Sequence, residues 1–162
     1  MTTGVLANPL GNLAVSLHQT STSPPTVRVS VANHNKHPVT ILSYQSPLDK
    51  IALPLGLLSV SPAGASKPLD LPTIEVSREW PPPKEALIVV PPSESVTNDL
   101  VLQSPQVPME MLGRKAAVAL KGRWMAVWPR DRSELSDEEI DHSSRSASSG
   151  EFTTDDLEII IG

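Results

Sequence analysis

The amino-acid sequence predicts an all-β domain, a sandwich of two antiparallel sheets. Short segments of alternating apolar and polar residues recur along residues 13–128, and Pro, Gly and Asn residues separate them. All 17 prolines lie within residues 1–130, spread through the connections, which argues against long helices and a doubly wound sheet. Seven or eight such strands are typical of an immunoglobulin-like sandwich. The chain has no cysteine, so the usual disulfide of that fold is absent.

The strands expected first along the chain have the clearest alternation. In residues 13–19, Leu13, Val15 and Leu17 share one face, and the stretch "TVRVSV" does the same with three valines. The stretch "NHNKHP" (33–38) then predicts a hairpin turn, because Asn tolerates left-handed backbone and Pro38 restricts the residue before it. Further strands are expected at residues 39–44, 57–61, 73–77, 86–90 and 95–102.

Residues 115–128 ("KAAVALKGRWMAVW") predict the longest strand. Its even-numbered face carries Val118, Leu120, Trp124, Ala126 and Trp128, and we expect both tryptophans in the core. A helix over residues 109–121 is the competing interpretation, since that stretch contains good helix formers. The alternation and the β-branched and aromatic residues favour a strand. Gly122 is expected to mark a bulge.

Charge divides the chain near residue 130. Residues 131–162 hold ten of the 18 acidic residues and two of the 13 basic ones, a net charge of −8, which leaves +3 for residues 1–130. We therefore expect a flexible N-terminus (1–12), a β-sandwich domain (13–130), a disordered acidic, serine-rich tail (131–156) and a strand-forming C-terminal peptide (157–162). The tail has too few apolar residues to offset its ordering entropy.

The C-terminal peptide "TTDDLEIII" is the main candidate binding element. Leu157, Ile159, Ile160 and Ile161 follow the acids Asp155 and Asp156, in a pattern that resembles a SUMO-interacting motif, which adds a strand to the edge of its partner's sheet. Three alternatives stay open: strand addition to a partner, docking on its own domain beside the basic Arg114, Lys115, Lys121 and Arg123, or no function. Ser136, Thr153 and Thr154 precede carboxylates and are candidate sites for an acidophilic kinase.

No segment carries a recognisable catalytic motif. The phosphate-binding loop, Gly-x-Ser-x-Gly and His-Glu-x-x-His patterns are missing. His34 and His37 have no third ligand nearby, so we expect a solvated turn and no metal or other cofactor. Trp80 precedes three prolines; we expect it to pack on the core beside a stiff connection between sheets, with docking of the prolines on an SH3 or WW domain as the alternative. The small charge of residues 1–130 argues against nucleic-acid binding.

The stretches "VRVSVANHNKHPVTILSYQSPLD" and "VVPPSESVTNDLVL" resemble the β-sandwich pro-domains of fungal deuterolysin-type proteases. The resemblance covers about residues 13–128. Those pro-domains carry "Pro-Gly-Glu-Ser" where this chain has "PPSES". The resemblance implies a β-sandwich, a fungal source, no catalytic residues and a partner that is a protease.

These observations lead to an expected function and location. We expect a non-catalytic protein-binding or adaptor module that acts through a sheet edge, loops and the acidic tail. The alternative is a small-molecule-binding or enzymatic accessory protein, with Tyr44, Trp80, Trp124 and Trp128 around a pocket between the sheets. The N-terminal segment lacks the pattern of a signal peptide, no apolar run is long enough to span a membrane, and the chain has no cysteine. We therefore expect a cytoplasmic or nuclear protein.

Overall fold

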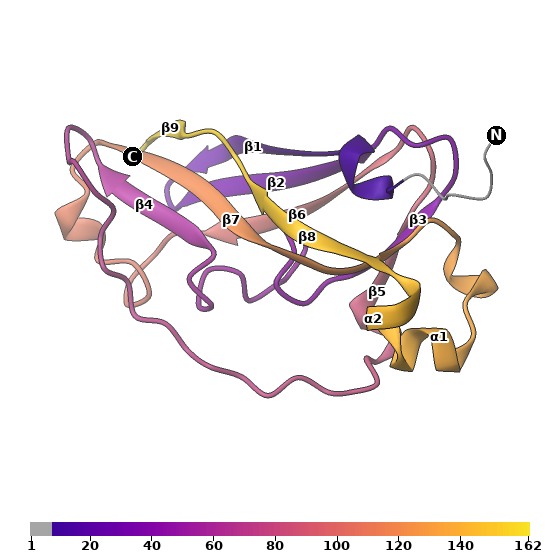
Figure 1. Ribbon diagram of the computed structural model, residues 1–162. Helices are drawn as coiled ribbons and strands as arrows, with labels where there is room; N and C mark the ends of the chain where they lie inside the picture. The colour runs from indigo at the N-terminus through magenta and orange to yellow at the C-terminus, as the bar shows by residue number, and fades with distance from the viewer. Residues whose placement is uncertain (1–7) are drawn as a thin grey trace.

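The computed structural model describes residues 8–162, and its strands form two antiparallel sheets (Figure 1). The strands are β1 (Leu13–Thr22), β2 (Pro25–Asn33), β3 (Val39–Leu42), β4 (Leu58–Pro62), β5 (Leu87–Val90), β6 (Ser95–Val101), β7 (Lys115–Trp128), β8 (Ser148–Thr153) and β9 (Leu157–Ile160). The short helices are η1 (Pro9–Asn12), η2 (Lys84–Ala86), η3 (Met109–Met111), η4 (Arg132–Glu134), α1 (Asp137–Asp141) and α2 (Ser143–Ser146). The predicted all-β sandwich is confirmed.

The smaller sheet has the strand order β1-β2-β6, and the larger one is built along the long strand β7. Along one edge of β7, the first half pairs with β4 and the end pairs with β3. The other edge of β3 pairs with β5. The opposite edge of β7 pairs with β9 and then with β8. The strand expected at residues 115–128 is therefore confirmed. Of the helix considered for residues 109–121, only the short η3 is present. None of the helices among the described residues is both long and apolar enough to cross a bilayer.

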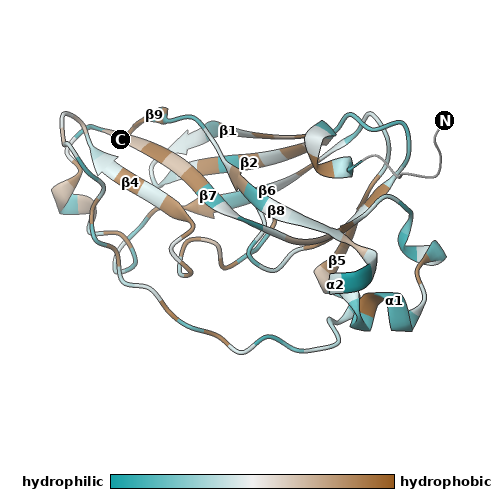
Figure 2. Cartoon of the chain, in the orientation of Figure 1, coloured by the Kyte–Doolittle hydropathy of each residue, from teal (hydrophilic) through white to brown (hydrophobic). Residues whose placement is uncertain are grey.

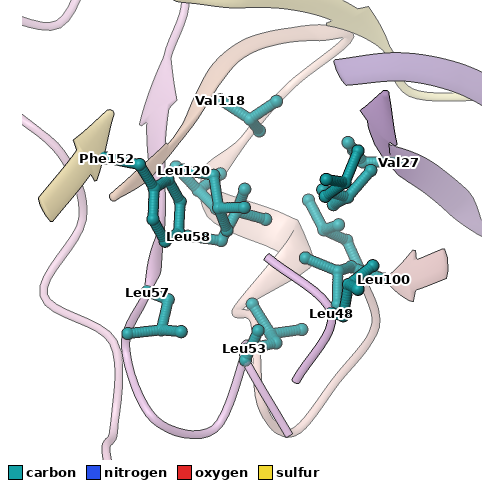
Figure 3. Close-up of a cluster of buried hydrophobic side chains, with 14 of the residues drawn as sticks. Val27, Leu48, Leu53, Leu57, Leu58, Leu100, Val118, Leu120 and Phe152 are labelled. Carbon is teal, nitrogen blue, oxygen red and sulfur yellow. The ribbon is translucent and has the colours of Figure 1, made fainter. Parts of the chain in front are cut away.

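The core fills the space between the two sheets. Figure 3 shows Val27 and Leu100 of the smaller sheet facing Leu58, Val118, Leu120 and Phe152 of the larger one. Alternation in β2 is complete, because Val27, Val29 and Val31 are all 0% exposed while the residues between them remain partly exposed. In Figure 2 the apolar residues accordingly recur at intervals along the strands. Burial of these branched side chains supplies most of the driving force for folding.

Gly122 marks a close approach of chain segments, where a bulge was expected. The irregularity in the pairing of β7 with β8 falls between Trp124 and Val127 instead. A Cβ atom on Gly122 would lie 2.5 Å from the carbonyl oxygen of Gln45 and 2.9 Å from the ring of Phe152. Only a residue without a side chain leaves room for both neighbours.

The segment between β2 and β3 crosses from one sheet to the other, so the hairpin expected at "NHNKHP" is wrong. Two asparagines of this crossing are buried and hydrogen-bonded. The side-chain amide of Asn33 donates to the carbonyls of His37 and Val90, and its oxygen accepts from the backbone and side chain of Asn35. This network satisfies the backbone groups that a crossing between sheets leaves unpaired.

The chain ends differ most from expectation. Of the N-terminal segment expected to be flexible (1–12), residues 1–7 lie outside the described part of the chain, whereas Pro9–Asn12 forms η1 with Pro9 buried. The disorder expected over residues 131–156 is not confirmed. That stretch contains η4, α1, α2 and β8, and its buried residues Leu135, Ile140 and Phe152 join the apolar clusters of the domain. The β-sandwich therefore continues well beyond residue 130.

Candidate binding surface

The C-terminal peptide is paired with its own domain. Residues 157–160 form β9, which runs antiparallel to β7 with Ile159 opposite Ala116 and Leu157 opposite Val118. Ile159 is 0% exposed, whereas Ile160 on the opposite face is 45% exposed. Of the three alternatives left open by the sequence, docking on the own domain is the one observed. Asp155 and Asp156 are exposed at the kink between β8 and β9.

The other side of β9 reaches β1, in the smaller sheet. The side-chain amide of Gln19 donates to the carbonyl of Ile160 at 2.7 Å and accepts from its N–H at 2.9 Å. The backbone N–H of Gly162 donates to the carbonyl of Thr22. Through these contacts the last residues close one side of the sandwich. The edge that the peptide would offer to a partner is therefore already in use.

The charge complementarity expected for a docked tail is present on the outer face of β7. Lys115 forms an ion pair with Glu158 at 3.8 Å, and both side chains are more than half exposed. Arg123 lies opposite Glu151 in the pairing of β7 with β8. Exposed pairs of this kind add little stability each, so the buried residues hold the tail more than its charges do.

The three candidate phosphorylation sites have different environments. Ser136 is the N-cap of α1: its hydroxyl accepts the N–H of Glu139, whose carboxylate accepts the N–H of Ser136. Thr153 is exposed at the end of β8. The Thr154 hydroxyl accepts the backbone N–H of Leu120 at 2.9 Å, so it is engaged in holding β7.

Residues 130–146 form a small cap over one end of the larger sheet. The Trp128 ring, 0% exposed, donates its N–H to the hydroxyl of Ser146, which in turn donates to the carbonyl of Glu139. Arg130 forms an ion pair with Glu139. The hydrogen bond from Arg130, reinforced by the N–H of Ser136, lowers the pKa of Glu139 to about 2. A serine-rich acidic stretch thus folds because it covers a buried tryptophan.

The described residues hold no side-chain cluster placed to bind a metal ion, and three of the four rings named for the alternative function are buried. Residues 8–162 contain no group of three or more His, Cys, Asp or Glu side chains placed to hold a metal ion. Trp124 and Trp128 are 3% and 0% exposed, as predicted for core residues, and Tyr44 is 8% exposed. A pocket of the kind expected in the alternative function would need these rings around a cavity. Trp124 and Trp128 are packed among the side chains of the two apolar clusters, whereas one side of Tyr44 also lines an open hollow.

The strand expected at residues 73–77 is not part of either sheet. Residues 69–80, which we call the strap, connect β4 with η2 and β5 without helix or strand. Figure 1 shows the strap as a long trace below the sheets, and in Figure 2 the same trace alternates between apolar and polar residues. The β-forming sequence "TIEVS" is therefore present but has no partner strand within the described chain.

The first end of the strap is anchored to the turns of the domain. Its backbone N–H groups at Leu69 and Ile74 donate to the carbonyls of Val60 and Pro54. The side chains of Leu69 and Leu71 pack against the core, and the side-chain amide of Gln106 donates to the carbonyl of Pro72. These contacts fix the strap up to residue 74.

The second anchor is a buried ion pair. Nη1 of Arg78 donates to Oδ2 of Asp49 at 3.1 Å, and Nη2 donates to Oδ1 and Oδ2 at 2.9 Å each. The Asp49 side chain is 4% exposed and also accepts the N–H groups of Gln45 and Ile51. The guanidinium lies 4.5 Å from the centre of the Tyr44 ring. The Tyr44 hydroxyl donates to the carbonyl of Glu79, and burial raises its pKa. Bidentate pairing makes this a rigid clamp.

A hollow of ≈ 310 Å³ lies beside this clamp, lined mostly by apolar surface. Its walls include Tyr44, Ile51, Pro83 and Ile88, with Arg78 at one side. The hollow is open to solvent at the end of the strap. It is an apolar recess next to the second anchor of the strap.

Between the two anchors the strap is exposed and its backbone is unpaired. No hydrogen bond within residues 8–162 engages the backbone of Glu75, Val76 or Ser77. Ile74 is 48% exposed, Val76 40% and Trp80 44%, although Trp80 was expected in the core. Trp80 contributes one hydrogen bond, from its ring N–H to the carbonyl of Asp141. Sequence reasoning found the β-forming pattern of this segment and missed its exposure, because the pattern carries no information about neighbouring strands.

A similar protein corrects the predicted location. The chain is 30% identical over 141 residues to an uncharacterised secreted protein of Arthroderma benhamiae (strain ATCC MYA-4681 / CBS 112371), with 86% of this chain and 70% of that protein covered. The expectation of an intracellular, cytoplasmic or nuclear protein is therefore contradicted, since the similar protein is secreted. The fungal source implied by the resemblance is supported. The resemblance to deuterolysin pro-domains is not shown.

The family model for the immunoglobulin-like domain matches residues 12–161. The match includes β8 and β9, in agreement with the pairing of both strands with β7. Two sheets of antiparallel strands around a common core are also the architecture of that fold. The chain belongs to the immunoglobulin-like domain family.

Proposed function

We propose that this protein is an extracellular, non-catalytic binding module that contacts a partner protein through the strap. The observation that carries the proposal is the combination of exposed apolar side chains at Ile74, Val76 and Trp80 with an unpaired backbone between them. Natural β-proteins normally pair or cover exposed apolar segments with an unpaired backbone, because such segments attract other chains. A strap that is held rigidly at both ends and left exposed in the middle favours recognition.

The secreted relative supports an extracellular setting for this contact. The C-terminal peptide is the weaker candidate, because β9 already pairs with β7 and contacts Gln19. A SUMO-type modifier would need this peptide free and an intracellular location. A deuterolysin-type protease, to whose pro-domains residues 13–128 have the loose resemblance described above, is the first candidate partner to test.

The experiment places a photo-crosslinking amino acid at position 77 and, in a matched control, at position 111. Ser77 is exposed within the strap, and Met111 is 58% exposed and lies in η3, outside the strap. Crosslinking is carried out in the extracellular fraction of the source organism and in mixtures with purified deuterolysin-type protease. We expect a specific crosslink from position 77 that is lost when Ile74→Ser/Val76→Ser is introduced into the same chain.

Two outcomes of this experiment would contradict the proposal. A crosslink that forms equally from positions 77 and 111, or that survives the double serine substitution, shows that the strap is not the contact surface. The Met111→Ser variant serves as the control for the loss of an exposed apolar side chain elsewhere.

A further inference from the structure

The backbone of the strap has one side that faces the domain and one that faces outward. In an extended chain the N–H and C=O of one residue point to the same side, and those of the next residue point to the opposite side. The N–H of Ile74 points inward, because it donates to the carbonyl of Pro54. Alternation from Ile74 therefore assigns the outward side to the N–H and C=O groups of Thr73, Glu75 and Ser77, and it ends before Glu79, whose carbonyl accepts from the Tyr44 hydroxyl. No hydrogen bond within the described residues engages them.

The strap also carries an excess of negative charge. Asp70, Glu75 and Glu79 are exposed and form no ion pair with any residue between 8 and 162. The only basic residue of the strap, Arg78, is paired with the buried Asp49. The nearest lysine beyond it in the sequence, Lys84, comes after three prolines. The strap is therefore acidic on its own.

Building on the proposed function, we propose that the strap binds an extended segment of its partner as a paired β-strand, and that this segment alternates apolar residues with lysine or arginine. The partner's backbone pairs with the outward N–H and C=O groups of Thr73, Glu75 and Ser77. Its apolar residues lie on the face that carries Ile74 and Val76, and its basic residues lie beside Glu75. Backbone pairing supplies affinity and the alternate side chains supply specificity.

Three features of the strap favour an extended, basic partner segment: its residue types, its two anchors and its charge. Thr, Ile and Val favour the extended conformation, so little conformational entropy is lost when a strand pairs with them. The two anchors hold the segment in place before binding. The unpaired carboxylates select a basic segment over an acidic one, because like charges directly opposite each other on paired strands are destabilising.

The test uses the full chain and two matched synthetic peptides, one alternating valine with lysine and the other alternating valine with glutamate. Binding is followed by NMR of the isotope-labelled protein, together with hydrogen exchange of the amides of Thr73, Glu75 and Ser77. We expect the lysine peptide to bind, to protect these amides by about tenfold or more, and to bind more weakly as salt rises. The glutamate peptide should leave the amides unprotected.

A charge-reversal variant separates the contribution of backbone pairing to peptide binding from that of the carboxylates of the strap. Glu75→Lys/Glu79→Lys should weaken binding of the lysine peptide by about tenfold and improve binding of the glutamate peptide, since the change reverses the field of the strap. The matched control is Glu110→Lys, an exposed carboxylate outside the strap. Equal binding of both peptides, protection elsewhere in the protein, or an effect of Glu110→Lys as large as that of the strap variant would overturn the inference. If the lysine peptide fails to bind while Ile74→Ser/Val76→Ser still abolishes the natural crosslink, the inference fails and the proposed function stands.

Discussion

Two adjacent isoleucines at the C-terminus provide a controlled test of how the tail docks. Ile159 faces the core at 0% exposure, and Ile160 faces outward at 45%. Ile159→Ala removes fully buried methyl and methylene groups, and we expect it to lower the free energy of unfolding by about 2–5 kcal/mol. For a chain of this length that loss corresponds to a decrease in Tm of about 5–15 °C. Ile160→Ala should change stability by about 0.5 kcal/mol or less.

The measurement is urea denaturation of both variants and the wild type. Residue type and position in the chain are matched, so the difference between the variants reports burial alone. Small, equal effects would show that β9 does not dock, and a larger effect at Ile160 than at Ile159 would indicate a register shifted by one residue. Hydrogen exchange gives a second readout, because the amides of Ile160 and Ile161 donate to Gln19 and to the carbonyl of Arg114. Rapid exchange at both amides would also refute the docked strand.

Three further substitutions test the contacts that shape the fold and the strap. Gly122→Ala should cost about 1–3 kcal/mol or more in urea denaturation, because the new Cβ would meet a backbone oxygen that cannot move aside. Arg78→Ala should cost about 2–3 kcal/mol, because it leaves the carboxylate of Asp49 buried with only backbone donors, and the cost should shrink in an Asp49→Asn background. Glu139→Gln should reduce stability at neutral pH. The pKa of Glu139 is lowered from 4.5 to about 2, so the stabilisation by its charged form is present above 4.5 and is lost as the pH falls toward 2. Denaturation curves of Glu139→Gln and wild type should therefore converge at low pH, and a constant gap would contradict this assignment.

Much of the sandwich was predictable from residue alternation. The pattern of Val27, Val29 and Val31 specified a strand with one buried face, and that of residues 115–128 specified the bounds of β7. Burial of Trp124 and Trp128 followed from the scarcity of other aromatic residues. The crossing at Asn33 was not predictable, because turn-forming residues indicate that the chain bends and not which strand it joins.

The tail was mispredicted because its composition was judged in isolation. A segment with few apolar residues cannot form a core of its own. It can still order if each apolar residue enters a core that already exists, and Leu135, Ile140 and Phe152 do this one at a time. One feature of the sequence could have indicated that the tail pairs with the domain. A strand as long as β7 presents two edges, and the strands expected within residues 13–130 were not assigned to both.

The strap and strand β8 show that the strand-forming pattern of a segment does not determine whether that segment is paired in a sheet. Local sequence reports how readily a segment adopts an extended conformation, whereas pairing depends on whether a sheet edge is free at that place. Residues 148–153 have a weak strand pattern and are paired as β8, because one edge of β7 accepts them. The strap has a strong pattern, "TIEVS", and is unpaired, because its anchors at Pro54 and Asp49 hold it on the turns instead of beside a strand. The proposal that the strap pairs with a strand of another protein rests on this difference, a strand-forming sequence that the fold itself does not use.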